Sequence, residues 1–338
     1  MIDLQKRIDA FAELGRRLAT LPDWQLDDWS RRAMSFNGWF TPESVKAAIN
    51  GIVAYLEPAG LQAWAARYPI ESQQPKTIGI VMAGNIPLVG MHDMLCVLIC
   101  GHTLQGKLSS QDPFLPKAVM TLLTEIEPGF ANKIHFVERL QGFNAVIATG
   151  SNNSARYFDF YFSKYPHIIR KNRHSCAILK GDEPEEELRK LGSDIFLYYG
   201  LGCRNVSKLY VPEGYNFSKL LDSTAQYKEV ANNHKYNNNY DYHKAVFLVN
   251  SIPHLDTGYL LLNENEALSS PISVVYYEQY SSEQQLVPRI EALREELQCI
   301  VSHQGWFPGS IPTGTAQEPR IDDYADGVDT MAFLTGLK

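Results

Sequence analysis

Apolar residues recur at helical spacing through the first part of the chain, as at Leu4, Ile8 and Phe11. This spacing predicts amphipathic helices over residues 1–70. One of these helices is expected to begin after Thr41, which can cap it, with Pro42 in its first turn. A polar stretch at 71–76 then predicts a hinge, after which the pattern changes.

Short apolar runs alternate with longer amphipathic stretches beyond the hinge, which predicts strands alternating with helices. The expected strands lie at 77–82, 103–108, 134–137, 144–148 and 175–179, and the expected helices at 88–100, 116–126 and 154–162. This alternation predicts an α/β domain with a parallel, doubly wound sheet.

A second α/β unit is expected to begin near Asp182. One helix is expected to begin at 184–188, and two more are expected at 216–231 and 282–296. The expected strands lie at 206–211, 245–249, 258–262 and 272–276. The stretch 232–242 is rich in Asn and Tyr and predicts a polar loop. The expected organisation is a helical segment (1–70), a first α/β domain (71–181), a second (182–312) and a segment returning to the first (313–338).

Composition narrows the class of protein. The chain has 338 residues, 45% of them hydrophobic, which is enough for two packed domains. Its formal net charge of −7 argues against a nucleic-acid-binding protein. No apolar run approaches the roughly 20 residues of a membrane span. The five scattered cysteines indicate a reducing cytoplasm, and Cys96 and Cys100 are expected to be core thiols, with no metal site.

One cysteine stands in a setting that suits chemistry. Gly200 and Gly202 precede Cys203, and an apolar strand is expected directly after it. The glycines allow a bend and leave room for a substrate beside the sulfur, so Cys203 is a candidate nucleophile. Arg204 and Lys208 are candidate cations for lowering the pKa of its thiol. The alternative is a structural thiol at a tight turn.

Polar residues follow two of the expected strands. Asn85, after Gly84, can point its amide at a developing oxyanion or can cap the next helix. Lys107, followed by Ser109 and Ser110, suits a ribose or a phosphate at the carboxyl end of a parallel strand. The alternative for these three residues is a solvated turn.

A third strand end carries Thr149, Gly150 and Ser151. Backbone amides at the start of a helix suit a pyrophosphate, although the chain has no G-x-G-x-x-G fingerprint. The basic stretch 164–173 could contact phosphates of coenzyme A or of a nucleotide, or could be a solvated loop.

Four segments, taken in order, resemble motifs of the aldehyde dehydrogenase superfamily. Gly-Asn-Ile-Pro at 84–87 is similar to the family's P-W-N-F-P segment, and Lys-Leu-Ser-Ser at 107–110 to K-P-S-E. Ala-Thr-Gly-Ser at 148–151 is similar to F-T-G-S, and 200–208 to G-Q-x-C-x-x-x-S-R. The resemblance covers residues 75–280. It implies a Rossmann-type cofactor domain plus a catalytic domain with Cys203 as the nucleophile.

The chain departs from the family at its general base. Aldehyde-oxidising members carry a glutamate about 22 residues after the F-T-G-S serine, and that count reaches Arg173 here. No carboxylate lies between Tyr165 and Lys180. Without a base to activate water, an acyl-cysteine would persist. The chain therefore resembles coenzyme A-linked reductases, and most closely the fatty acyl-CoA reductases of the bacterial luminescence type.

This resemblance implies a reaction and its ligands. Cys203 would take the acyl group of a coenzyme A or carrier-protein thioester, and Asn85 would stabilise the oxyanion. Gly84, Lys107, Ser109, Ser110, Thr149, Gly150 and Ser151 would form the cofactor site. Ser110 stands where NAD-preferring members often have glutamate, which favours NADPH. A homo-oligomer, or an acyl-transferase or synthetase partner, is also implied. The alternatives are an NAD(P)-dependent dehydrogenase for another aldehyde, or a non-catalytic cofactor-binding subunit of an acyl-transfer complex.

Overall fold

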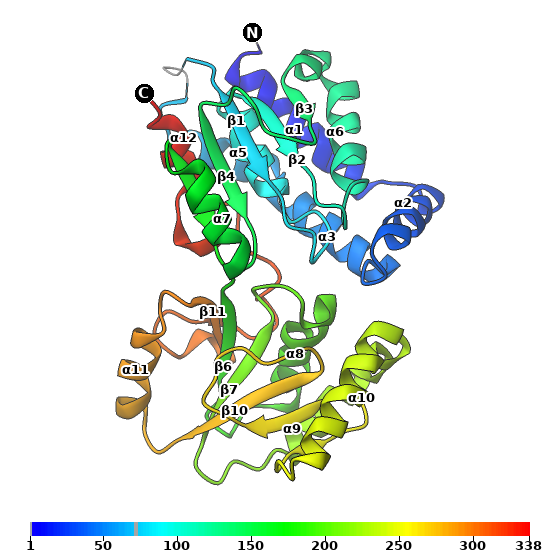
Figure 1. Ribbon diagram of the computed structural model, residues 1–338, viewed down its shortest axis with the longest axis vertical. Helices are drawn as coiled ribbons and strands as arrows, with labels where there is room; N and C mark the ends of the chain where they lie inside the picture. The colour runs from blue at the N-terminus through cyan, green and yellow to red at the C-terminus, as the bar shows by residue number, and fades with distance from the viewer. Residues whose placement is uncertain (1, 71–73) are drawn as a thin grey trace. The chain divides into compact units, whose positions relative to one another are not determined.

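The computed structural model describes residues 2–70 and 74–338, so the hinge expected at 71–76 lies partly outside the described residues. The chain forms two compact units. Unit 1 comprises Met1–Asn172 and Pro319–Lys338, and unit 2 comprises Arg173–Glu318. Unit 2 is therefore an insertion between two parts of unit 1, and each unit has a sheet of its own (Figure 1).

The sheet of unit 1 is entirely parallel. Its strand order is β3-β2-β1-β4-β5, with β1 (Thr77–Val81), β2 (Thr103–Lys107), β3 (Ile134–Phe136), β4 (Ala145–Thr149) and β5 (His167–Arg170). Ile80 is paired with Gly106 on one side and Ile147 on the other. The expectation of a parallel, doubly wound sheet is confirmed, and four of the five strands predicted for it lie within one or two residues of their expected bounds. The fifth, expected at 175–179, is instead β6 (His174–Ile178) of the second sheet, because unit 2 begins at Arg173.

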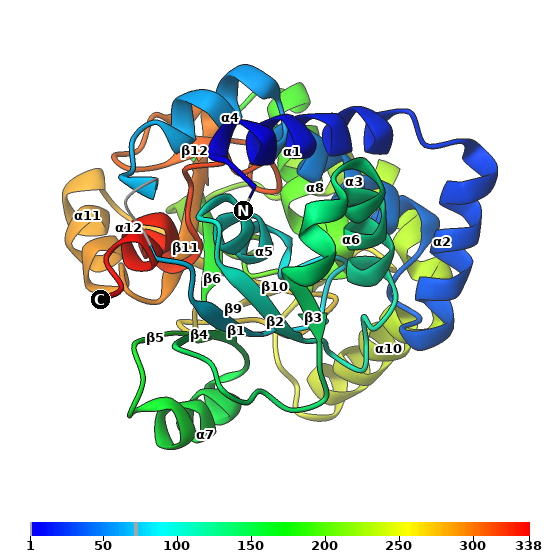
Figure 2. The same cartoon turned by 90° about the horizontal axis from the view of Figure 1, so that it is seen from above.

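Helices cover both faces of this sheet. Figure 2 shows α7 (Asn152–Phe162) on the opposite face from α5 (Met91–Ile99) and α6 (Leu115–Ile126). Helix α5 is buried on nearly all sides, because its sequence is apolar almost throughout. Cys96 and Cys100 are buried in its packing, as expected for core thiols.

Four helices precede the sheet: α1 (Leu4–Ala19), α2 (Asp23–Phe36), α3 (Pro42–Tyr55) and α4 (Pro58–Ala65). The Thr41 hydroxyl accepts a 3.4 Å hydrogen bond from the Ser44 N–H, and Pro42 opens α3. The capped start expected there is therefore confirmed.

The last segment of the chain packs into unit 1 through η6 (Ala325–Gly327) and α12 (Thr330–Thr335). The Trp64 indole N–H donates to the Tyr324 hydroxyl at 2.8 Å, and the Tyr68 hydroxyl donates to Asp329 at 2.9 Å. The side chain of Met331 is fully buried. The core of unit 1 thus includes side chains from both parts of its chain.

The sheet of unit 2 is parallel except at one edge. Its order is β12-β11-β6-β7-β10-β9-β8, and only the β8–β9 pair is antiparallel. The strands are β6 (His174–Ile178), β7 (Val206–Pro212), β8 (Leu255–Asp256), β9 (Leu261–Glu264), β10 (Val274–Tyr280), β11 (Leu297–Ser302) and β12 (Ile311–Pro312).

Two hydrophobic clusters lie on the two faces of this sheet. One joins Leu209 and Val211 of β7 to α8 (Glu185–Phe196) and α9 (Ser218–Thr224). The other joins Tyr210 to α11 (Glu283–Ala292). Alternate residues of β7 face opposite clusters, as the two-residue period of a strand requires.

Three expectations for unit 2 were wrong. The polar loop expected at 232–242 and the strand expected at 245–249 are both parts of one helix, α10 (His234–Val249). Tyr236, Tyr240 and Phe247 give it a buried face. The helix expected at 216–231 is two pieces, α9 and the 3-10 helix η4 (Ala225–Asn232). Within residues 2–70 and 74–338, no helix is both long and apolar enough to cross a membrane.

Candidate active site

The turn before β7 exposes a thiol. It follows α8 and the 3-10 helix η3 (Leu197–Gly200) and carries Cys203. Cys203 is exposed, whereas Cys176 on the neighbouring strand is fully buried. Only an accessible thiol can attack a substrate, so this turn is the structure's best candidate for a nucleophile.

The backbone before Cys203 is strained. Tyr198, Tyr199 and Gly200 have successive φ values of 55°, 58° and 78°, all in the left-handed region. Such a φ costs a residue with a side chain about 1–3 kcal/mol, whereas glycine adopts it freely. Consecutive residues of this kind persist only when their surroundings hold them.

A buried asparagine supplies much of that hold. Asn205 is 3% exposed, and its side-chain oxygen accepts a 2.8 Å hydrogen bond from the Gly202 N–H. Its side-chain nitrogen donates to the carbonyl of Leu197 at 2.7 Å and to that of Asp194 at 3.0 Å. One amide therefore fastens the cysteine turn to the end of α8. The sequence contained a signal for it, a polar residue between a cysteine and an apolar strand, which was not used.

The end of α8 also holds a distant loop. The fully buried Asp194 carboxylate accepts hydrogen bonds from the N–H groups of Gly314, at 2.6 Å, and Ala316, at 3.0 Å. Burial raises the pKa of Asp194 to about 7, although the two N–H groups act in the opposite direction. Arg204, next to Cys203, donates to the Ala316 carbonyl at 3.4 Å. Asp194 thus holds both segments: its carbonyl accepts from Asn205 of the cysteine turn, and its carboxylate accepts from the 313–316 loop.

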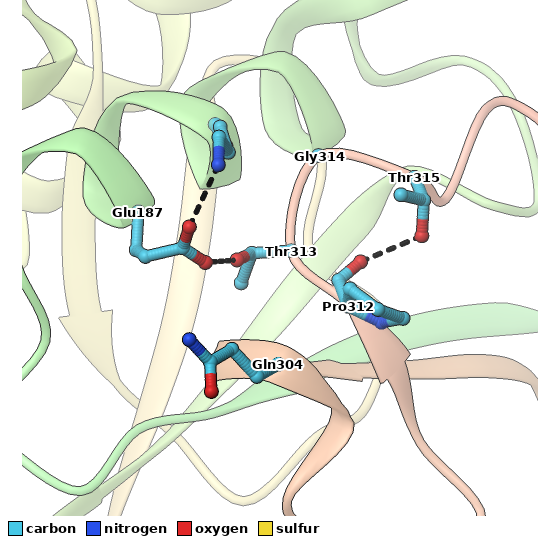
Figure 3. Close-up of a pocket in the computed structure, with 7 residues that line it drawn as sticks. Glu187, Gln304, Pro312, Thr313, Gly314 and Thr315 are labelled. Carbon is cyan, nitrogen blue, oxygen red and sulfur yellow. Dashed lines mark hydrogen bonds and ion pairs between the residues drawn. The ribbon is translucent and has the colours of Figure 1, made fainter.

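That loop lines a cavity of about 590 Å³ in unit 2 (Figure 3). Lys190 and Thr313 both donate to the Glu187 carboxylate in its wall. Burial opposes ionisation of Glu187, but hydrogen bonds from Lys190, Thr313 and His303 lower its pKa to about 2. Both carboxylate oxygens are therefore committed to partners within the protein.

A serine connects Cys203 to a second thiol. The Ser175 hydroxyl donates to the Cys203 carbonyl at 2.9 Å and lies 3.1 Å from the sulfur of Cys299. Burial raises the pKa of the Cys299 thiol to about 11. Cys299 is therefore protonated at neutral pH, and because it is also less exposed than Cys203 it is the weaker nucleophile of the two thiols.

In unit 1, the candidate residues gather at the carboxyl end of the sheet. Val81, the last residue of β1, pairs with Lys107, the last residue of β2. Asn85 is exposed in the turn after β1, and Ser110 is exposed after β2. Since β1 also pairs with β4, the residues after β4 follow the same edge.

Glycine is needed at position 84 for close packing. A Cβ atom there would lie 2.5 Å from the Ser109 hydroxyl oxygen. The backbone of Gly84, in the turn after β1, therefore packs against the side chain of Ser109, in the turn after β2. The structure brings these two predicted site residues together.

The turn after β4 begins a helix. Ser151 is the N-cap of α7, and its hydroxyl oxygen accepts from the Ser154 N–H at 3.2 Å. The Gly150 N–H donates to the Arg170 carbonyl at 3.3 Å. Thr149 is the last residue of β4. The residues after β1, β2 and β4 therefore share one edge of the unit 1 sheet, whereas Cys203 belongs to unit 2.

No family model and no curated protein matches this sequence. Solved structures do match it. An aldehyde dehydrogenase of Bacillus cereus in complex with NAD+ superposes with a TM-score of 0.63 at 14% identity, covering 89% of this chain and 72% of that one. The chain has the aldehyde dehydrogenase fold.

Two further aldehyde dehydrogenases give the same result. A putative aldehyde dehydrogenase of Burkholderia cenocepacia has a TM-score of 0.66 at 14% identity, covering 89% of this chain and 74% of its own. The Mycobacterium tuberculosis enzyme complexed with NAD+ has a TM-score of 0.61 at 12% identity, with 88% and 73% covered. The fold expected from four short motifs is confirmed, and the luminescence-type subgroup stays a prediction.

Within the aldehyde dehydrogenase fold, one candidate cation is used elsewhere. Lys208 is fully buried in β7, 3.1 Å from a carboxylate oxygen of Glu278, and it also bonds the Asn265 carbonyl. Burial lowers the pKa of Lys208 to about 8. Its ammonium group belongs to the interior of unit 2, so Arg204 is the better supported of the two cations.

Part of the basic stretch 164–173 forms β5 and is therefore not a solvated loop. Lys164 and Lys171, on either side of β5, are exposed, and contact between them and a phosphate stays a prediction. Arg170 is buried and forms an ion pair with Asp93, and it donates to the Thr330 hydroxyl at 2.8 Å. Arg173 donates to the Leu297 carbonyl at 3.2 Å. Arg170 is therefore not a phosphate ligand but a support for the aldehyde dehydrogenase fold.

Proposed function

We propose that this chain is a nicotinamide-dependent enzyme of the aldehyde dehydrogenase type that reduces an acyl thioester to an aldehyde. The observation that carries the proposal is the exposed Cys203 on a strained turn held by Asn205. Strain maintained around one accessible nucleophile is typical of active sites.

The lack of an acidic residue at the position expected for a general base favours reduction of a thioester over oxidation of an aldehyde. No Asp or Glu lies in residues 165–180, where an aldehyde-oxidising relative would carry its base. Water would therefore be a poor acceptor for an acyl group on Cys203. A coenzyme A or carrier-protein thioester is the substrate class that fits, with a fatty acyl group as the expected acyl chain.

The residues of unit 1 fit a nicotinamide dinucleotide. Glycine at position 84 places no side chain over the carboxyl ends of β1 and β2. A Cβ atom at this position would collide with Ser109. Lys107 and Ser110 are exposed at this edge and would bind the adenosine ribose, and Ser151 opens α7, where amides suit a pyrophosphate. When bound, the nicotinamide supplies the hydride that reduces the acyl group on Cys203.

The protein's own residues would carry the acyl transfer. The Cys203 thiolate forms a bond to the thioester carbonyl carbon, and the carrier leaves as its thiolate. The Asn85 amide and the Cys203 N–H would donate to the carbonyl oxygen while it bears negative charge. Ser110, being short and neutral, leaves room for a 2′-phosphate, which favours NADPH.

The test is to incubate the purified chain with acyl-CoA substrates of several lengths and with NADPH or NADH. We expect loss of the reduced-nicotinamide absorbance, formation of aldehyde, and an acyl adduct on Cys203 by mass spectrometry when the nicotinamide is omitted. Cys203→Ala should abolish all three signals, and Cys299→Ala is the matched control. Oxidation of free aldehydes with no acylation by any thioester would contradict the proposal.

A further inference from the structure

The turn that carries Asn85 is fixed at two points. Asn85 lies between Gly84 and Leu88, and each of these has its backbone held by a buried side chain from elsewhere in unit 1. The Gly84 carbonyl accepts a 3.1 Å hydrogen bond from the Asn37 side-chain amide. The Leu88 N–H donates to an Asp112 carboxylate oxygen at 2.8 Å.

The anchor at Leu88 holds an unfavourable conformation. Leu88 has a φ of 61°, in the left-handed region, although it carries a branched side chain. Its carbonyl also accepts from the Met91 N–H at 3.0 Å, at the start of α5. A residue held in this way costs about 1–3 kcal/mol, which the surroundings must offset.

Asp112 is buried and is itself well positioned. Its N–H donates to the Ser109 carbonyl at 3.2 Å, and Ser109 packs against Gly84. Burial raises the pKa of Asp112 to about 6, while the N–H groups of Leu88 and Leu115 favour its ionised form. Burying a carboxylate is costly unless it is hydrogen-bonded, and the Leu88 N–H supplies Asp112 with such a bond.

The other anchor, Asn37, follows α2. Its side-chain oxygen accepts from the Trp39 N–H at 3.2 Å, so the amide that reaches Gly84 cannot rotate freely. It is 4% exposed. The two anchors therefore come from separate parts of unit 1 and hold the turn on either side of Asn85.

We infer that Asp112 and Asn37 are positioning residues that set the place of the Asn85 amide during acyl transfer to Cys203. This inference rests on the proposed function, because it gives Asn85 the role of an oxyanion donor. Oxyanion donors act only when they are held where charge develops, and a misplacement of about 1 Å can cost a hundredfold in rate.

The experiment compares two reactions of the same thiol. Attack on an acyl thioester creates an oxyanion, whereas alkylation by iodoacetamide is a displacement that creates none. A positioning role for Asp112 therefore affects the first reaction and spares the second. Both are followed on the full chain, as the mass of the Cys203 adduct against time.

Three variants separate positioning from stability. Asp112→Ser has a side chain one atom shorter, so its hydroxyl does not reach the Leu88 N–H. Asp112→Asn keeps the side-chain volume and one acceptor oxygen. Asn37→Ala removes the other anchor. Glu125→Gln changes an exposed acid in α6, the helix that follows Asp112, and is the matched control.

We expect Asp112→Ser and Asn37→Ala to slow acylation by at least about tenfold, with alkylation within about twofold of the parent chain. Asp112→Asn should lie between them and the control. If the parent chain is acylated and both anchor variants are acylated at the same rate as the parent, the inference fails while the proposed function stands. The inference also fails if the anchor variants lose acylation and alkylation rates to the same extent. If no thioester acylates the parent chain, the proposed function fails and this inference with it.

Discussion

The side-chain oxygen of Asn205 accepts a 2.8 Å hydrogen bond from the Gly202 N–H, one residue before the exposed Cys203. The same amide donates to two carbonyls at the end of α8, so Cys203 is held against a helix. The reactivity of this thiol should therefore depend on a residue that makes no contact with a substrate.

Asn205→Ala is expected to destabilise unit 2 and to slow acylation of Cys203. Loss of these buried hydrogen bonds leaves carbonyls unpaired, at a cost of about 1–3 kcal/mol in the free energy of unfolding. Urea denaturation followed by circular dichroism measures that cost. Asn205→Asp keeps the acceptor for Gly202 and loses the donors to α8. Equal acylation rates in the parent chain and both variants would rule out a role for Asn205 at the nucleophile.

Cys203 is expected to react first when the folded chain meets iodoacetamide. Cys96, Cys100 and Cys176 are buried, and burial raises the pKa of each of their thiols. Cys299 has a pKa of about 11 and should follow slowly. Peptide mapping after short exposures gives the order. Labelling of Cys203 at or below the rate of Cys299 would remove the basis for its catalytic assignment.

The buried Asp194 should make unfolding pH-dependent. Its folded pKa, about 7, is above its ordinary value, so its contribution to stability is present below the ordinary pKa and is lost as pH rises through about 7. The free energy of unfolding should therefore fall across this range, by at most about 1.4 kcal/mol per pH unit from this one group. Urea titrations of Asp194→Asn should show a shallower fall. An identical pH profile for that variant would contradict this account.

Ser110→Glu is expected to shift cofactor preference from NADPH to NADH. A carboxylate beside the ribose would repel a 2′-phosphate and accept a hydrogen bond from a 2′-hydroxyl. The ratio of kcat/KM for the two cofactors should change by about tenfold or more. Ser110→Gln has the same length without the charge and serves as the control. A ratio that is unchanged in Ser110→Glu would place the ribose elsewhere.

Apolar patterning was sufficient to predict β1, β2, β3 and β4 of unit 1. β1 and β4 are short apolar runs between polar turns, and they are buried on both faces. β5 was missed because His167 and Arg170 made it resemble a loop, although Arg170 is neutralised inside the unit by Asp93. A charged residue with a buried partner cannot be recognised from local sequence.

The same patterning failed at α10. The apolar run at its end, which includes Leu248 and Val249, was expected to be a buried strand, but these two side chains are 61% and 84% exposed. The buried face of α10 is formed largely by Tyr236 and Tyr240, which lie in the stretch where a polar loop is predicted. Tyrosine can be buried if its hydroxyl finds a partner, and Tyr236 donates to the Tyr259 carbonyl at 3.0 Å.

The candidate site was only partly predictable. Cys203, Asn85 and Lys107 are marked by residue type and by their position at strand ends. Their supports are not marked: Asp194 bonds residues 314 and 316, and Asn37 bonds Gly84. Hydrogen bonds between residues so far apart in sequence depend on the tertiary fold, which no local pattern reports.

The division of unit 1 into two stretches of chain affects the order in which the protein can fold during synthesis. Unit 2 is continuous in sequence and can pack as soon as Glu318 has left the ribosome. Unit 1 lacks Tyr324 and Met331 until later, so Trp64 and α5 stay without their final neighbours while the whole of unit 2 is made. The unit translated first is therefore completed last. A chain truncated after Glu318 and released from the ribosome should have a protease-resistant unit 2 beside a protease-sensitive amino-terminal part.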